Sequence, residues 1–158
     1  EPGGTPLGIK LRNMALDGEA KSKIAEMFLF MADRAEHIEE VIKKNKNDTI
    51  ISDRSMISGI AYASALSIDE LINLNLIATN NTLPTHVILL ELTPHELKFR
   101  LSQKENDSIE LRGIDYLINI QNRMKETIKR LNINHIIIDA SLKIEEIEKK
   151  IEDFINGE

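Results

Sequence analysis

Cysteine and tryptophan are absent from the 158 residues, and only four phenylalanines and two tyrosines supply aromatic rings. The lack of cysteine excludes disulfides and thiolate metal sites and suits a reducing cytoplasm, where we expect the protein to act. No apolar run is long enough to span a bilayer, so we expect no membrane partner. The net charge of −6 argues against general electrostatic binding to a nucleic acid polymer.

The remaining composition is that of an ordinary globular protein, with 42% apolar and 29% charged residues. This length and composition predict a single domain over residues 1–158. Hydrophobic periodicity predicts short strands that alternate with helices. The expected strands cover residues 49–53, 86–91 and 135–139, and the expected helices cover 7–16, 21–44, 57–66, 69–78, a segment opened by Pro94, 109–131 and 143–155.

This alternation predicts an α/β fold, with a parallel sheet covered by helices on both faces. In open sheets of this kind, ligands bind beyond the carboxyl ends of the strands. Polar residues stand at all three expected ends, at 53–54, 91–93 and 139–141. We therefore expect the ligand site at that edge of the sheet.

Asp53 and Arg54 are the first candidates for phosphate chemistry. A carboxylate near a metal–phosphate centre, beside an arginine that holds phosphate oxygens in a bidentate fork, suits such a site. A structural ion pair at a strand end is the alternative. Tyr62, eight residues after Arg54, either closes a sugar pocket or packs as an ordinary helical tyrosine.

Phe30 and Arg34 lie four residues apart in the expected long helix, so they share one face. A ring that stacks on a nucleobase contributes about 1–3 kcal/mol, and a neighbouring arginine can donate to a base carbonyl. The alternative is a core phenylalanine beside a solvated arginine. The four histidines have no metal-ligand spacing, so we expect them at the surface or capping strands.

Five segments of the chain resemble bacterial thymidylate kinases. They are EPGGTPLG at 1–8 with Leu11-Arg12, FLFMADR at 28–34, ISDR at 51–54 with Ser58 and Ala61-Tyr62, LPT at 83–85 with the following strand and Arg100-Leu101, and IDAS at 138–141. Each segment is weak alone, but together they follow the family's order across nearly the whole chain. The resemblance implies a three-layer, P-loop nucleoside monophosphate kinase-like fold. It also implies a homodimer that uses ATP and Mg²⁺ to phosphorylate dTMP for dTTP synthesis.

The resemblance further implies roles for individual residues that contact the nucleobase and the sugar. Phe30 would stack on thymine and Arg34 would bond its exocyclic oxygen. Gly59 stands where relatives often carry serine or asparagine, so a base contact would pass to Ser58 or to water. Tyr62 would crowd the sugar.

At the phosphate, the resemblance implies that Arg12 and Arg54 hold dTMP, with Glu1 beside them. Asp53 would help to order the magnesium–phosphate centre through water, and no residue is assigned as a direct metal ligand. Catalysis would depend on Arg54, Asp53 and a residue of the lid region. Arg100, Gln103 and Lys104 are the candidates for that residue, and Lys104 is the one assigned.

On the ATP side, the resemblance implies that the polar segment 102–108 is the lid. Arg100 and the loop Asp139, Ala140 and Ser141 would contact ATP, with the loop bordering its adenine.

The family begins with a strand, a phosphate loop and a helix, a unit of about 30 residues that precedes the EPGGT segment. None of the 158 residues matches that loop, so we expect the reading frame to continue upstream and these residues alone to be inactive. Two alternatives remain open. One is another nucleotide or nucleoside kinase of the same fold, and the other is a non-catalytic nucleotide-binding or interaction module.

Overall fold

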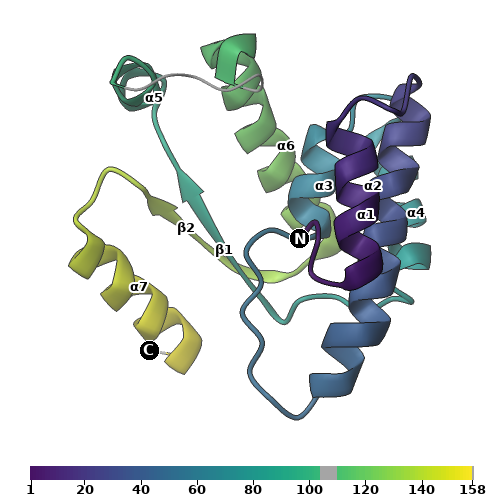
Figure 1. Ribbon diagram of the computed structural model, residues 1–158. Helices are drawn as coiled ribbons and strands as arrows, with labels where there is room; N and C mark the ends of the chain where they lie inside the picture. The colour runs from purple at the N-terminus through teal and green to yellow at the C-terminus, as the bar shows by residue number, and fades with distance from the viewer. Residues whose placement is uncertain (104–109, 158) are drawn as a thin grey trace. The chain divides into compact units, whose positions relative to one another are not determined.

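The computed structural model describes residues 1–103 and 110–157 (Figure 1). They form two compact units, Glu1–Leu83 and Pro84–Glu158, which are described in turn. Among the described residues, no helix has both the length and the apolar character to cross a membrane.

The regular elements of the first unit are all helices. They are α1 (Pro6–Leu16), α2 (Lys23–His37), a π-helical turn (Ile38–Ile42), a 3₁₀ turn (Lys43–Asn45), α3 (Met56–Tyr62) and α4 (Ile68–Ala78). Each α-helix begins after a serine or threonine that caps its free N–H groups, such as Thr5 before Pro6. The four helices expected here are present, but two of them are shorter than predicted. The helix expected over 21–44 is α-helical only to His37, and the helix expected over 57–66 ends at Tyr62.

The core of this unit lies where α2, α3 and α4 meet. Met31 of α2, Ile60 of α3 and Leu71 of α4 are all at most 7% exposed. α1 packs on α2, and α2 in turn packs on α4. The core therefore fixes the direction in which the polar side chains of α2 and α4 point.

The prediction of a strand over residues 49–53 is wrong, because no strand forms there. The segment is irregular, and Ile51 is 90% exposed. A strand requires a neighbour that pairs with its N–H and C=O groups. Within the described residues the only sheet consists of two strands of the second unit, so this β-branched segment has no pairing partner.

The second unit contains β1 (His86–Glu91) and β2 (Asn134–Asp139), which pair in parallel with Glu91 opposite Asp139. Its helices are α5 (Pro94–Leu101), a 3₁₀ turn (Glu110–Arg112), α6 (Ile114–Leu131) and α7 (Ile144–Asn156). The two expected strands and the expected helices are confirmed, with α6 beginning at Ile114 after a glycine of positive φ. The carboxyl ends of both strands lie side by side, as expected for a parallel pair.

Candidate functional site

Arg34 is the centre of a buried polar cluster in the first unit. It is only 6% exposed, and its Nε donates to Glu1 Oε2 at 2.9 Å. Its Nη1 donates to Asn75 Oδ1 at 2.7 Å. A buried charge is tolerated when it is paired and hydrogen-bonded, and both conditions are met here. The hypothesis of a solvated Arg34 is therefore wrong.

The third nitrogen of the Arg34 guanidinium, Nη2, differs from the other two. No described residue accepts a hydrogen bond from it. Among the described residues, no fully buried side-chain nitrogen or oxygen lacks a partner, so Nη2 is not completely sealed from solvent. It lies beside Gly59, where an added Cβ would come within 2.6 Å of it. Arg34 thus presents one open donor nitrogen from an otherwise buried side chain.

Glu1 connects Arg34 to other parts of the unit. Its second carboxylate oxygen, Oε1, lies 2.9 Å from Nδ1 of His37. Its backbone nitrogen donates to the carbonyl of Asp53 at 3.1 Å. The resemblance placed Glu1 beside a phosphate, whereas here both carboxylate oxygens are engaged by Arg34 and His37. The expectation of a surface or strand-capping role is wrong for His37, which is buried on α2.

The segment that follows Glu1 is held against α2 by Asp33, which is 1% exposed. Asp33 Oδ1 accepts a hydrogen bond from the Gly3 nitrogen at 2.9 Å. An added Cβ at Gly8 would lie 2.3 Å from the same oxygen, so α1 can approach α2 only with a glycine there. At Gly3, an added Cβ would lie 3.0 Å from Cδ of Arg12. Residues 1–4 therefore contact Arg12, Arg34 and the backbone of Asp53.

Arg54 and Arg12 are exposed. The Arg54 guanidinium carbon lies 5.1 Å from the centre of the Tyr62 ring, a cation–π contact. Neither arginine forms an ion pair with a described carboxylate. The alternative of a structural Asp53–Arg54 ion pair is therefore wrong. Arg54 also has a φ of 67°, and residues with such strained backbones cluster at functional sites.

Two other predicted residues lie in the same unit without a distinctive contact. Phe30 is half-buried on α2, one turn before Arg34, so its ring is not sealed in the core. Ser58 Oγ donates to the carbonyl of Ser55 at 3.2 Å within the first turn of α3.

In the second unit, the predicted ATP-side residues form a surface turn. Asp139 Oδ1 accepts from the nitrogen and the Oγ of Ser141, at 2.8 and 2.7 Å. These hydrogen bonds, from the hydroxyl first and then from the backbone, lower the pKa of Asp139 below its ordinary value. Arg100 Nη2 donates to the carbonyl of Ala140 at 2.5 Å. The structure thus brings these four residues together, while Lys104 and most of segment 102–108 lie outside the described residues.

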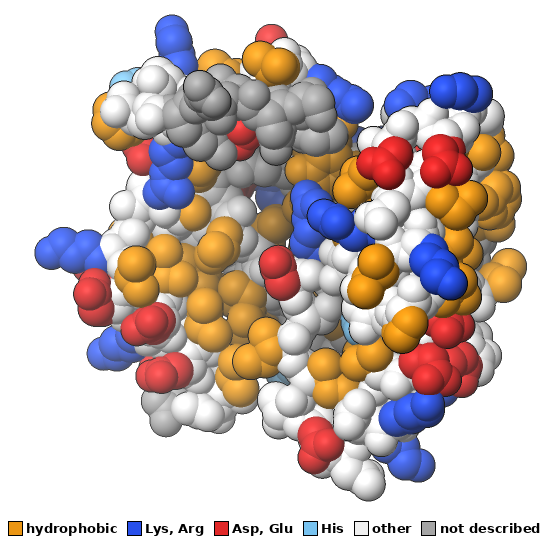
Figure 2. Space-filling view, in the orientation of Figure 1, with side chains coloured by type: hydrophobic (Ala, Val, Ile, Leu, Met, Phe, Trp, Pro, Cys, Tyr) orange, Lys and Arg blue, Asp and Glu red, His pale blue; other side chains and the backbone are white. Residues whose placement is uncertain are grey.

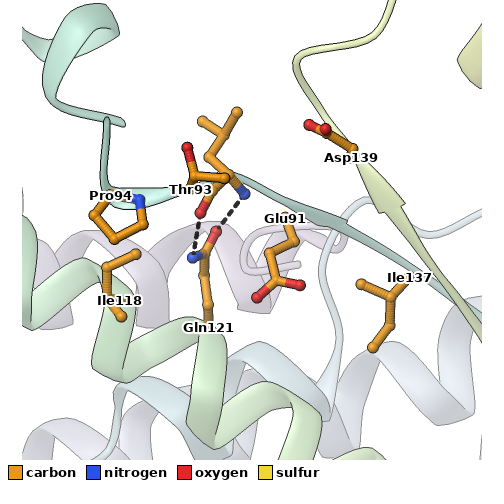
Figure 3. Close-up of a pocket in the computed structure, with 8 residues that line it drawn as sticks. Glu91, Thr93, Pro94, Ile118, Gln121, Ile137 and Asp139 are labelled. Atoms are coloured by element: carbon orange, nitrogen blue, oxygen red, sulfur yellow. Dashed lines mark hydrogen bonds between the residues drawn. The ribbon is translucent and has the colours of Figure 1, made fainter. Parts of the chain in front are cut away.

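A hollow of about 430 Å³ opens at the carboxyl ends of β1 and β2, as expected for a parallel pair (Figure 3). Gln121 of α6 fixes the chain that leaves β1, because its amide accepts from the Leu92 nitrogen at 2.9 Å and donates to the Leu92 carbonyl at 3.0 Å. Glu91 is paired with Lys125. The hollow is lined by Glu91, Leu92, Thr93, Pro94, Ile118, Gln121, Ile137 and Asp139.

Sequence reasoning missed Asp33, His37 and Asn75. One of them carried a detectable signal. Asn75 is a polar residue on the apolar stripe of α4, in line with Ile68, Leu71 and Ile72, which are buried. A polar residue in such a position is expected to have a buried partner.

Arginine suits the recognition of phosphate groups, so a fixed arginine donor and two exposed arginines in one unit suit a phosphorylated ligand such as a nucleotide. Comparison with known proteins agrees with this class. The family model described as thymidylate kinase matches residues 1–151. The chain belongs to the thymidylate kinase family.

Individual relatives give the same result. A protein named thymidylate kinase from Aliarcobacter butzleri is 81% identical over 156 residues, which is 99% of this chain and 82% of the relative. Proteins with the same name from Wolinella succinogenes and Sulfurimonas denitrificans are 52% and 48% identical. The matches cover 96% and 99% of this chain, and 80% and 83% of those relatives.

Proposed function

We propose that the first unit binds dTMP through the open nitrogen of Arg34, in an enzyme that transfers a phosphate from ATP to dTMP for dTTP synthesis. Membership of the thymidylate kinase family supports the activity. The observation that supports the site is the buried guanidinium whose Nη2 alone remains without a described acceptor. A donor held in this way is preorganised, so little freedom is lost when a ligand accepts from it.

At the base, Nη2 of Arg34 donates to the exocyclic oxygen of thymine. Phe30, one turn earlier on α2 and half-buried, stacks on the ring. Cytosine carries an amino group where thymine has this carbonyl oxygen. The amino group is itself a hydrogen-bond donor, so it cannot accept a hydrogen bond from Nη2. An unpaired polar group of this kind is a strong source of discrimination. Ser58 and Tyr62 of α3 complete the base and sugar contacts.

At the phosphate, Arg12 and Arg54 supply positive charge that no described carboxylate neutralises. Two anionic substrates must approach one another, and such arginines offset their repulsion. Glu1 holds Arg34 and thereby ties the base contact to the segment beside Arg12.

The carboxylate of Asp53 is exposed and has no described partner, which suits Mg²⁺. Magnesium keeps several waters and is bound by one or two carboxylates together with substrate phosphates. Asp53 fits this donor set as a partner through water. The bound ion would neutralise charge on the phosphates during transfer.

On the ATP side, Arg100 and the turn Asp139, Ala140 and Ser141 contact the nucleotide, and Lys104 acts as the cation of the lid. The hydrogen bonds within the turn support this role because they fix its shape. Transfer of the γ-phosphoryl group is in line and needs positioning and charge neutralisation rather than a covalent intermediate.

The complete fold has three layers, with the parallel strands between two layers of helices. In Figure 1, α6 and α7 lie on opposite sides of the β1–β2 pair, which supports this arrangement within the second unit. Because both substrates are cytoplasmic nucleotides, the enzyme acts in the cytoplasm.

The functional form is a homodimer that packs through α1 and α2. These helices carry large exposed apolar side chains, and Figure 2 shows apolar side chains at the surface in that region. Large exposed apolar patches mark interaction sites. The side chains are Leu7, Ile9, Met14, Leu16, Ile24 and Phe28, with exposed fractions from 37% to 59%.

The substitution Arg34→Ala in the full-length protein tests the base contact. We expect the KM for dTMP to rise about 100-fold, because a charged hydrogen bond and its fixed geometry are lost together. The KM for ATP should change less than threefold. Steady-state kinetics with each substrate varied in turn measures both values. Equal losses for the two nucleotides would contradict the role of Arg34.

A further inference from the structure

Asn75 is the most deeply buried polar side chain that contacts Arg34. It lies on α4 and is 1% exposed. Its neighbours on the same helical stripe, Ile68, Leu71 and Ile72, belong to the apolar core. An asparagine here loses its hydration without adding apolar packing, so its hydrogen bonds must account for its presence.

Those hydrogen bonds fix the orientation of the Asn75 amide. Its Nδ2 donates to the carbonyl of Leu71 at 2.8 Å, one turn earlier on the same helix. The amide oxygen consequently faces Arg34 and accepts from Nη1 at 2.7 Å. The acceptor is therefore attached to the rigid core rather than to a flexible side chain.

Glu1 alone would not fix the guanidinium. Its hydrogen bond to Nε holds one edge of the planar group, which could still tilt about that contact. A second acceptor at Nη1 defines the plane and leaves Nη2 as the nitrogen without a described acceptor, in a guanidinium that packs beside Gly59. Because the Asn75 oxygen is neutral, it adds this restraint without placing a second carboxylate beside Arg34.

We propose that Asn75 is a positioning residue for thymine recognition, which acts through Arg34 and touches neither nucleotide. It holds the guanidinium in the one plane in which Nη2 meets a base carbonyl. This inference rests on the proposed role of Arg34. It predicts that discrimination between dTMP and dCMP depends on a side chain in the helical core.

The test is a competition between the two nucleotides in the full-length enzyme. Mixtures of dTMP and dCMP are incubated with ATP, and the ratio of the two products gives the ratio of their kcat/KM values. This ratio does not depend on the fraction of folded enzyme, so partial unfolding cannot imitate the effect. We expect Asn75→Leu to lower the preference for dTMP about tenfold. Asn75→Ala, which leaves space instead of filling it, should do the same.

A matched control is available on the same helix. Asn73 is exposed and its side chain makes no described hydrogen bond, so Asn73→Leu should leave the ratio within twofold of the wild type. The Arg34→Met variant supplies a second comparison. If Asn75 acts through Arg34, Asn75→Leu should have no further effect on the ratio in that background.

The outcomes separate the positioning role of Asn75 from the proposed role of Arg34. If Arg34→Met lowers the preference but both Asn75 variants leave it unchanged, the positioning role is wrong. The same conclusion follows if Asn75→Leu still lowers the ratio tenfold in the Arg34→Met background. If Arg34→Met itself leaves the preference unchanged, the proposed function of Arg34 is wrong.

Discussion

The two units carry their polar site residues in opposite ways. In the first unit, Asp33, Arg34 and Asn75 are at most 6% exposed and bonded across separate elements. In the second unit, Asp139 and Ser141 are exposed and bonded within one short turn. Buried hydrogen bonds are stronger and more specific than exposed ones, because water competes less for their atoms. The first unit therefore holds its polar side chains rigidly across several elements, whereas the second unit holds them within one turn.

This difference has an energetic consequence. Removing one partner of a buried ion pair costs about 3–5 kcal/mol, whereas exposed pairs contribute about 0–1 kcal/mol. Substitutions near Arg34 and Asp33 should accordingly affect stability or specificity far more than those near Asp139.

Among the glycine substitutions, Gly8→Ala should produce the largest change in stability. The added Cβ would come within 2.3 Å of Asp33 Oδ1 and 2.9 Å of Thr5 Oγ1, so α1 and α2 must separate. Overpacking of this kind costs about 1–3 kcal/mol. For a protein of this size, the melting temperature should fall by roughly 2–12 °C, as measured by circular dichroism.

Gly18 supplies the control for this substitution. It is exposed, has a φ of 71° and has no atom within 4 Å of an added Cβ. Asparagine tolerates positive φ, so Gly18→Asn should shift the melting temperature by no more than about 2 °C. A similar loss in both variants would show that the close approach of Gly8 to Asp33 is not the cause.

Gly59→Ala should reduce the use of dTMP more than it reduces the stability of the protein. Alanine favours a helix over glycine by about 1 kcal/mol, which offsets part of the cost of overpacking at this position. The new Cβ would lie 2.6 Å from Arg34 Nη2 and would displace the guanidinium. We expect kcat/KM for dTMP to fall about threefold to tenfold, because small displacements of a positioned donor reduce its effect. An unchanged kcat/KM would show that Nη2 does not meet the ligand beside Gly59.

The smallest effect on stability is expected in the second unit, at Asp139. Hydrogen bonds from Ser141 hold the pKa of Asp139 below its ordinary value of 3.8. A depressed pKa adds stability above the unfolded-state pKa, and this contribution is lost only as the pH falls through the folded-state pKa, below 3.8. The contribution of Asp139 to stability should therefore stay the same when the pH is lowered mildly from neutral.

Ser141→Ala removes the hydroxyl hydrogen bond, so the pKa of Asp139 should rise toward 3.8. Titration of the carboxyl carbon of Asp139 by NMR measures this change. A midpoint that does not move would contradict the assigned cause. Thr82→Ala, a change in the first unit, is a suitable control and should leave the midpoint of Asp139 in place.

Much of the fold could be predicted from local sequence. The strand over His86–Glu91 and the helix that follows Pro94 were predicted because apolar runs and a proline at the first turn are local features. The segment 49–53 has the same β-branched composition but forms no strand, because strand formation also requires a distant pairing partner.

Local sequence also predicted one part of the candidate site and not the other. The spacing of Phe30 and Arg34 predicted a shared helical face, and Arg34 does carry an open donor. Its acceptors, Glu1 and Asn75, are 33 and 41 residues away in sequence. No local pattern connects such positions, so the orientation of Arg34 emerged only from the packing of α2 against α4.

A crystal structure of the full-length enzyme with dTMP tests the central claim most directly, namely that a buried Arg34 presents Nη2 to the base. We expect the hydrogen bonds of Arg34 to Glu1 and Asn75 to persist, with Nη2 about 2.7–3.2 Å from a thymine carbonyl oxygen. A complex in which Arg34 leaves these acceptors, or in which Nη2 contacts the phosphate while another residue meets the base carbonyl, would contradict it.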